Sequence, residues 1–451
     1  MSGENQTGPR SAEADAGIRL RTAKSLLRFN TCGSVDDGKS TLIGRLLYDS
    51  KGLLADQVTA LEAASRRRGL AAIDLSLLTD GLLAEREQGI TIDVAYRYFA
   101  TPARKFIIGD SPGHAQYTRN MVTAASTADV AVLLVDVRHG LRQQTRRHAY
   151  LARWVGIPRV VLAVNKMDLV DGAASRAAFE AIRAQFHRFA TGLGFTEVRE
   201  IPLSALNGDM VVERGDALGW YSGPTLLEYL ETVPARHDDA GEDLQGQPLR
   251  FPVQRVARVS RGNAQPGSGF EEREFRGYQG TVASGCLQVG DEVLALPAGT
   301  RARLAEIFTA DGPVAEAAAD TAVTVRLDTE IDVSRGDVLV SPAAVPRLSQ
   351  DIEAEVCWFD PEPLVVARPY LIKHGGATVP ARFAALDYRI DVDSLERVER
   401  PDALAMNDIA RVRLRTQRPL AVDQYRSNRV TGAFIVIDQT TNRTVAAGTV
   451  A

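Results

Sequence analysis

A glycine-containing segment near the N-terminus has the residue types and spacing of a phosphate-binding loop. Residues 33–40 read Gly-Ser-Val-Asp-Asp-Gly-Lys-Ser, which matches the pattern G-x-x-x-x-G-K-[ST]. Glycines allow backbone N–H groups to close around phosphate oxygens, Lys39 would bridge the β- and γ-phosphates, and the Ser40 hydroxyl would bind Mg²⁺. The expected nucleotide contacts in this segment are Gly33, Ser34, Val35, Asp36, Asp37, Gly38, Lys39, Ser40 and Thr41.

A second segment carries residues suited to a metal ion and the terminal phosphate. Asp110-Ser111-Pro112-Gly113 follows the apolar run 106–108, and a carboxylate at the end of a strand can hold Mg²⁺ through water. Gly113 would let its amide approach the γ-phosphate. Thr91 precedes this segment and could cover the ion only when a γ-phosphate is present. We therefore expect the metal ligands to be Ser40, Thr91 and Asp110, and nucleotide contacts from Asp110, Ser111, Pro112 and Gly113.

His114 directly follows this segment. A single histidine is more often a structural residue than a catalyst. One residue beyond a γ-phosphate sensor, however, it is placed to orient the attacking water and to contact the nucleotide. The expected catalytic residues are His114, Lys39 and Thr91.

A third segment indicates which base the nucleotide carries. Asn165-Lys166-Met167-Asp168 follows the apolar run 160–164. The Asp168 carboxylate can accept hydrogen bonds from N1–H and the exocyclic amine of guanine, whereas adenine offers no such pair of donors. Ser204-Ala205-Leu206 follows another strand-like run and would supply a backbone amide to the guanine O6. The predicted ligands are therefore GTP and Mg²⁺.

The chain also shows how these segments would be positioned. Strand-like runs alternate with helical patterns up to about residue 235, which predicts an α/β P-loop GTPase domain. Short β-rich runs separated by glycines follow, and these predict two small all-β barrel domains. The expected organisation is a disordered tail at 1–24, a GTP-binding domain at 25–235, a linker at 236–248, and barrels at 249–345 and 346–451, with a mobile loop at 260–274.

Composition limits the other function classes. The 451 residues carry a net charge of −4, which argues against a broad nucleic-acid-binding surface. The three cysteines lack CxxC spacing and predict neither a disulfide framework nor a metal site. The N-terminus lacks the apolar core of a signal peptide, and the apolar stretches are of strand length. We expect a cytoplasmic protein that binds neither nucleic acid nor membrane.

Longer segments resemble one particular family. Residues 25–40, 84–99, 116–121, 220–228, 275–281 and 330–337 resemble the GTPase subunit of bacterial sulfate adenylyltransferase, a member of the elongation-factor-type GTPase superfamily. The chain departs from that family at Ser111 and Ala115, where the family usually has Thr and Glu. It has no second phosphate loop, so we expect no fused adenylylsulfate kinase.

The resemblance implies a GTPase that drives the chemistry of a partner. A smaller ATP-pyrophosphatase-like subunit, in a heterodimer or higher assembly, would make adenosine 5'-phosphosulfate and pyrophosphate from ATP and sulfate, the first step of sulfate assimilation. Hydrolysis of GTP by this chain would drive that uphill synthesis. The alternative is a translation-type, elongation-factor-like GTPase that carries an aminoacyl-tRNA or engages the ribosome. Both need the same GTP site, so only the two β domains could separate the hypotheses.

Overall fold

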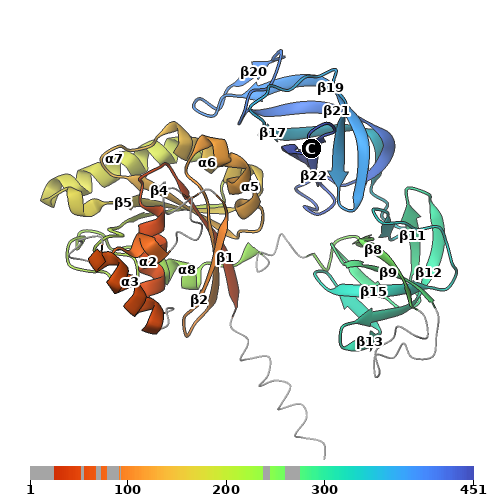
Figure 1. The fold of residues 1–451 in the computed structure, drawn as a ribbon, viewed down its shortest axis with the longest axis horizontal. Helices are drawn as coiled ribbons and strands as arrows, with labels where there is room; N and C mark the ends of the chain where they lie inside the picture. Colours follow the sequence, from red (N-terminus) through yellow and green to blue (C-terminus); the bar gives the residue numbers. More distant parts are fainter. Residues whose placement is uncertain are drawn as a thin grey trace, which may run out of the picture. The chain divides into compact units, whose positions relative to one another are not determined.

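The computed structural model describes residues 25–51, 55–67, 73–78, 91, 93–236, 244–259 and 275–451. The predicted tail at 1–24, most of the predicted linker and the predicted loop at 260–274 lie outside the described residues. The chain divides into two compact units, Met1–Ala235 and Arg236–Ala451 (Figure 1). Among the described residues, no helix is both long enough and apolar enough to span a membrane.

The first unit is built on a six-stranded sheet with the strand order β2-β3-β1-β4-β5-β6. Its strands are parallel except for β2, which pairs antiparallel with β3 at one edge. All seven residues of β4 and of β5 are buried, as expected for strands covered on both faces. The strands are β1 (Leu26–Gly33), β2 (Ala95–Ala100), β3 (Lys105–Asp110), β4 (Val130–Asp136), β5 (Arg159–Asn165) and β6 (Glu197–Pro202).

Helices cover both faces of this sheet. Figure 1 shows α5, α6 and α7 on one face and α2, α3 and α8 on the other. Thr225 caps α8 through a capping box. The Thr225 hydroxyl accepts from the Glu228 N–H, and the Glu228 carboxylate accepts from the Thr225 N–H. The helices are α2 (Lys39–Asp49), α3 (Ala55–Arg67), α5 (Thr118–Ser126), α6 (Gln143–Trp154), α7 (Gly172–Thr191) and α8 (Leu226–Thr232), with 3₁₀ turns η1 (Leu75–Leu78), η2 (Ala115–Tyr117) and η3 (Met167–Leu169).

The second unit contains two groups of strands. In the first group, the pairing path β7-β16-β11-β12-β15-β9-β8 is antiparallel throughout and surrounds a core that includes Phe251, Tyr278 and Leu287. Its strands are β7 (Arg250–Pro252), β8 (Arg255–Val259), β9 (Phe275–Thr281), β10 (Cys286–Gln288), β11 (Glu292–Leu296), β12 (Thr300–Thr309), β13 (Gly312–Val314), β14 (Glu316–Ala318), β15 (Ala322–Leu327) and β16 (Val338–Val340).

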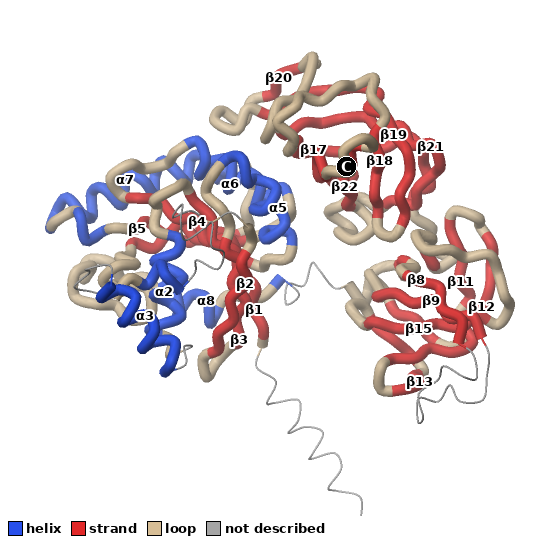
Figure 2. The backbone as a smooth tube through the Cα atoms, in the orientation of Figure 1, coloured by secondary structure: helices blue, strands red, loops and turns tan. Residues whose placement is uncertain are grey.

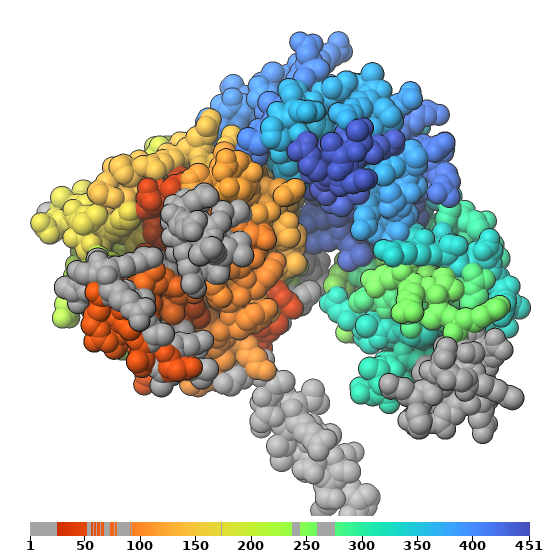
Figure 3. All heavy atoms as spheres, in the orientation of Figure 1, coloured from red at the N-terminus to blue at the C-terminus, as the bar shows by residue number. Residues whose placement is uncertain are grey.

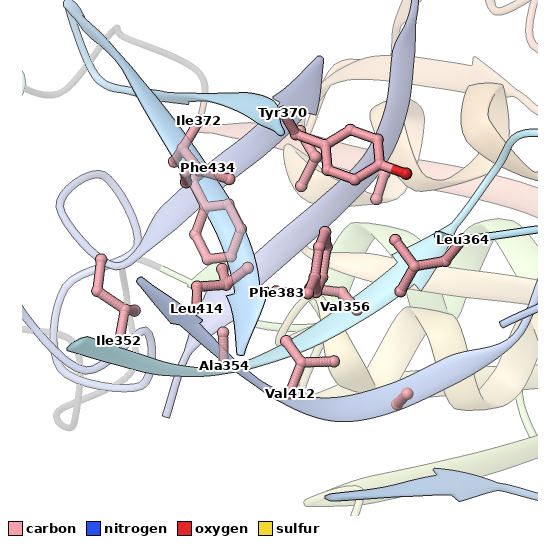
Figure 4. Packing of buried hydrophobic residues seen from close by; sticks show 14 of the residues in the cluster. Ile352, Ala354, Val356, Leu364, Tyr370, Ile372, Phe383, Val412, Leu414 and Phe434 are labelled. Atoms are coloured by element: carbon pink, nitrogen blue, oxygen red, sulfur yellow. The ribbon is translucent and has the colours of Figure 1, made fainter. Parts of the chain in front are cut away.

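The second group closes into a six-stranded barrel, because β18 pairs with both β22 and β19 (Figure 2). Trp358, Tyr370 and Phe383 lie in its core and make edge-to-face ring contacts, with ring centres 5.8 Å apart for Trp358 and Tyr370 and 5.6 Å apart for Tyr370 and Phe383. Figure 4 shows Tyr370 and Phe383 among the other apolar side chains of this core. Its strands are β17 (Arg347–Trp358), β18 (Tyr370–His374), β19 (Ala377–Ile390), β20 (Arg397–Glu399), β21 (Ile409–Val422), β22 (Ala433–Asp438) and β23 (Thr444–Val450).

The two strand groups of the second unit pack directly against each other. The Arg250 guanidinium of the first group binds both carboxylate oxygens of Asp423, at 2.8 and 3.0 Å, and both side chains are largely buried. A small apolar cluster of Leu296, Val338, Val340 and Ala421 adds to the contact. Figure 3 shows the atoms of the two groups, green to cyan and blue, in contact.

Candidate nucleotide-binding site

A cavity of about 450 Å³ in the first unit has a size typical of small-ligand sites. It gathers four of the segments that the sequence singled out: the phosphate loop, Thr91, the Gly113–His114 pair and Lys166. Three of these segments meet because β1, β3 and β5 are parallel, so the loops that follow them lie at the same edge of the sheet. Ligands bind at this edge in open α/β folds. The lining residues are Val35, Asp36, Gly38, Lys39, Ser40, Thr41, Thr91, Gly113, His114 and Lys166.

Glycines are required where the phosphate loop turns into α2 and where the next loop meets it. Gly38, the residue before α2, has φ +94°, a left-handed conformation that a side chain would strain. A Cβ atom on Gly113 would lie 2.6 Å from the Lys39 ammonium and 3.0 Å from the Gly33 carbonyl oxygen. The loop that follows β3 therefore lies against the phosphate loop.

Lys39 lies within the phosphate loop with only 7% of the residue exposed. Its ammonium donates to the carbonyl oxygens of Gly33 and Ser34, at 3.1 and 2.8 Å. Burial lowers the pKa of Lys39, although the carboxylates of Asp110 and Asp37 act in the opposite direction. The Ser34 hydroxyl is buried and has no hydrogen-bond partner among the residues that the structure describes. A loop with a confined cation and an unsatisfied hydroxyl is suited to an anionic ligand.

The last residue of β3 and the residue that follows it are fixed to β1. Asp110 is 1% exposed, and the Thr31 hydroxyl lies 3.4 Å from one of its carboxylate oxygens. Ser111 donates from its N–H to the Thr31 carbonyl oxygen at 3.2 Å and from its hydroxyl to the Asn30 side-chain oxygen at 2.5 Å. Serine at position 111 thus keeps a hydroxyl that ties this loop to the neighbouring strand.

His114 and Thr91 both line the cavity and are partly exposed. The imidazole of His114 meets the ring of Tyr117 edge-to-face, with 6.3 Å between the ring centres. Residues 79–90 and 92, on either side of Thr91, lie outside the described residues. All three predicted catalytic residues, His114, Thr91 and Lys39, therefore line the same cavity.

The predicted guanine-reading segment also supports the phosphate loop. The Asn165 side-chain amide donates to the Asp37 carbonyl oxygen at 2.8 Å, and the Lys166 ammonium donates to the Asp36 carbonyl oxygen. The Asn165 side-chain oxygen also accepts from the Ala205 N–H at 2.9 Å. The Ala205 amide, which was expected to contact the base, therefore donates to Asn165 in this structure. The two segments form one connected framework.

Asp168 is oriented by the other predicted base-reading segment. The Ser204 hydroxyl donates to the Asp168 carboxylate at 2.5 Å and accepts from the Asn207 N–H at 3.1 Å. Met167 is buried and Leu206 is exposed at the surface. A carboxylate held in this way can present its second oxygen to a base.

Two residues that support this site were not singled out from the sequence. His148 of α6 accepts a hydrogen bond from the Gly33 N–H at 3.1 Å and is completely buried. Its position in a helix carries no spacing signal that would have identified it. Asp136, the last residue of β4, binds the Lys166 ammonium at 3.0 Å. An acidic residue directly after an apolar run is the same signal that identified Asp110, so Asp136 could have been found.

The sheet order, with the phosphate loop between β1 and α2, is that of a P-loop GTPase domain. A family model described as elongation factor Tu GTP binding domain matches residues 24–235. A second, described as GTP-eEF1A C-terminal domain-like, matches residues 351–451. The predicted fold class, a P-loop GTPase domain followed by β domains, is confirmed.

Relatives of known name identify the family more closely. Sulfate adenylyltransferase subunit 1 of Shewanella oneidensis is 49% identical over 430 residues, which cover 94% of this chain and 85% of that protein. The same subunit of Teredinibacter turnerae is 48% identical over 438 residues, which cover 97% of this chain and 89% of that protein. The chain belongs to the sulfate adenylyltransferase subunit 1 family, as the resemblance predicted.

A longer relative matches as well. The bifunctional enzyme CysN/CysC of Mycobacterium tuberculosis is 53% identical over 427 residues, which cover 94% of this chain. The aligned region is 67% of that protein, so the chain spans about two thirds of its length.

Proposed function

We propose that this chain binds and hydrolyses GTP as one subunit of a sulfate adenylyltransferase. Hydrolysis would drive the synthesis of adenosine 5'-phosphosulfate and pyrophosphate from ATP and sulfate. The observation that carries the proposal is the convergence of the phosphate loop, Thr91, Gly113–His114 and Lys166 on one cavity. Family membership over 94% of the chain supplies the substrate class.

The residues around the cavity have distinct proposed roles. Lys39 and the loop amides would bind the β- and γ-phosphates, and Gly113 would approach the γ-phosphate. Asp168 would select guanine, because its carboxylate can accept two hydrogen bonds that only guanine donates. His114 would orient the water that attacks the γ-phosphate.

The residues present fit a magnesium ion. Ser40 and Thr91 bring hydroxyl oxygens to the cavity, and Asp110 brings a buried carboxylate to the end of the neighbouring strand. Such hard oxygen donors, completed by phosphate oxygens and water, are the set that Mg²⁺ prefers. When bound, the ion would neutralise phosphate charge.

Coupling requires a partner. The family name, subunit 1, implies a second subunit, and we propose that it is the smaller ATP-pyrophosphatase-like subunit that carries out adenylyl transfer. The GTP and GDP states of this chain must then bind the partner's reaction states with different affinities. We place the assembly in the cytoplasm, without nucleic acid or membrane as a ligand.

One experiment tests this function against the translation-type alternative. The purified chain would be assayed for phosphate release from GTP, with the smaller subunit, ATP and sulfate each added or withheld. We expect turnover to rise only when all three are present and adenosine 5'-phosphosulfate to accumulate. Turnover that ignores them but responds to ribosomes or tRNA would refute the proposal.

A pair of variants controls this assay. Lys39→Ala should abolish both activities while the fold survives, because it removes the buried cation of the phosphate loop. Lys51→Ala makes the same change at an exposed position outside the cavity and should leave both intact. Unchanged GTP hydrolysis in Lys39→Ala would show that the site is elsewhere.

A further inference from the structure

Asp136 brings a buried carboxylate to the edge of the proposed nucleotide site. It ends β4 beside Asn165, its neighbour in the pairing of β4 with β5. Its side chain is 1% exposed, yet it contacts two cations. The Arg138 guanidinium donates to both carboxylate oxygens, at 3.0 and 2.6 Å, and the Lys166 ammonium lies 3.0 Å from one of them.

This carboxylate is held in its charged form. Burial alone would raise the pKa of Asp136, but hydrogen bonds from Arg138 and then Lys166 outweigh burial and lower the pKa well below its usual range. A charged carboxylate between two cations is a strong and directional contact. Asp136 is therefore able to fix the position of the Lys166 side chain.

Lys166 in turn contacts the phosphate loop. Its backbone is left-handed, with φ +63°, and its ammonium also donates to the carbonyl oxygen of Asp36. Asp36 is likewise left-handed, with φ +65°. A single ammonium group thus joins the end of β4 to the strained turn of the phosphate loop.

We propose that Asp136 is a positioning residue for guanine-nucleotide binding, which acts by holding the Lys166 ammonium against the phosphate loop. The inference rests on the proposed function, since it assumes that this cavity takes a guanine nucleotide. The proposal predicts the direction in which nucleotide affinity changes when the Asp136 charge is removed. A negative charge beside a polyphosphate ordinarily repels it, so removing the charge should tighten binding on electrostatic grounds alone. Removing the positioning contact should weaken binding instead.

The test is the affinity of the full-length chain for a fluorescent GDP analogue, together with the analogue's dissociation rate. We expect Asp136→Asn to weaken binding about 10- to 100-fold and to speed dissociation, because it removes a charge-assisted contact. Asp171→Asn is the matched control, since Asp171 is exposed and its side chain makes no capping hydrogen bond to α7. It should leave the affinity unchanged or slightly tighter.

A double-mutant cycle tests whether Asp136 acts through Lys166. In a Lys166→Met background, Asp136→Asn should add less than about a threefold loss, since the two side chains act as one unit. Equal losses in both backgrounds would overturn the role of Lys166, and unchanged or tighter binding by Asp136→Asn would overturn the inference itself. If Asp136→Asn does not fold, Lys166→Met alone must show the same loss.

The wild-type arm separates this inference from the proposed function. A wild-type chain that does not bind GDP would refute the guanine-nucleotide site and the role of Asp136 with it. A wild-type chain that binds GDP while Asp136→Asn binds equally well would refute only the role of Asp136. Thermal unfolding of each variant would confirm that the compared chains are folded at the assay temperature.

Discussion

Protonation of His148 should weaken the first unit as the pH falls. His148 is completely buried, and its Nδ1 accepts from the Gly33 N–H, so the ring must be neutral in the folded state. Burial, and then the positive charges of Lys39 and Arg147, lower the pKa of His148 from 6.5 to about 3. The unfolded chain binds a proton at this residue near the ordinary histidine pKa, well before the folded chain does.

The sign and size of the effect follow from this difference in pKa. The folded state of His148 has the lower pKa, so its contribution to stability is complete above the unfolded pKa and is lost as the pH falls towards the folded value. At a pH of about 5, the free energy of unfolding should have fallen by about 2 kcal/mol relative to a pH of about 8. Other titrating groups add to the raw pH dependence, so a variant is needed to isolate this residue.

His148→Asn supplies the comparison. At a pH of about 8 the variant should be less stable by about 1–3 kcal/mol, because the buried Gly33 N–H loses or weakens its hydrogen bond. At a pH of about 5 the gap should shrink by about 2 kcal/mol, since the variant has no imidazole to protonate. Among the described residues the other buried histidine is His374, which lies in the second unit, and its contribution cancels in the difference.

Urea unfolding of the full-length chain measures this gap. The transition that belongs to the first unit is the one that added GDP shifts to higher urea, because a ligand of the folded state stabilises it by mass action. A gap between wild type and His148→Asn that stays constant from high to low pH would refute the assignment of His148 as a buried neutral acceptor.

Three further substitutions test other parts of the structure. Gly113→Ala should weaken GTP binding by about tenfold or more in equilibrium binding, because a methyl group would press on the phosphate loop; Gly219→Ala, which meets no atom closer than 3.9 Å, should not. Asp168→Asn replaces an acceptor with a donor, so competition binding should show a preference for xanthine over guanine nucleotides; unaffected GTP affinity would contradict the base-reading role. Asp423→Asn strips Arg250 of its buried partner and should lower the stability of the second unit by about 3 kcal/mol in urea unfolding; no change would show that the pair contributes little.

The fold was predictable where local pattern and tertiary environment agree. The apolar run from 130 to 135 became β4, buried throughout, because a parallel sheet covered on both faces demands a continuous apolar strand. The glycine-separated runs after residue 249 became antiparallel strands. The pairing of β18 with both β19 and β22 could not be predicted from any one segment, because barrel closure depends on pairing between strands far apart in the chain.

The site was predictable only as far as its motifs extend. Lys39, Gly113 and Lys166 meet at one cavity because their spacing relative to strands fixes the end of the sheet where each lies. His148 could not be anticipated in the same way, because a buried acceptor for one backbone N–H is chosen by packing of α6 against β1. Sequence motifs mark the groups that face a ligand, whereas a supporting group such as His148 lies at a position that no motif marks.

The hydrogen bonds around the cavity imply that base recognition and phosphate recognition are not independent. Asn165 holds the Asp37 carbonyl and Lys166 holds the Asp36 carbonyl, while their neighbour Asp168 is the proposed reader of guanine. A base that displaces the 165–168 segment would therefore also disturb the phosphate loop. Discrimination against adenine should then exceed the loss of two hydrogen bonds at Asp168, because residues in one network are energetically coupled. This energetic coupling is reciprocal, so a substitution that disrupts the phosphate loop should also reduce the selectivity for guanine over adenine.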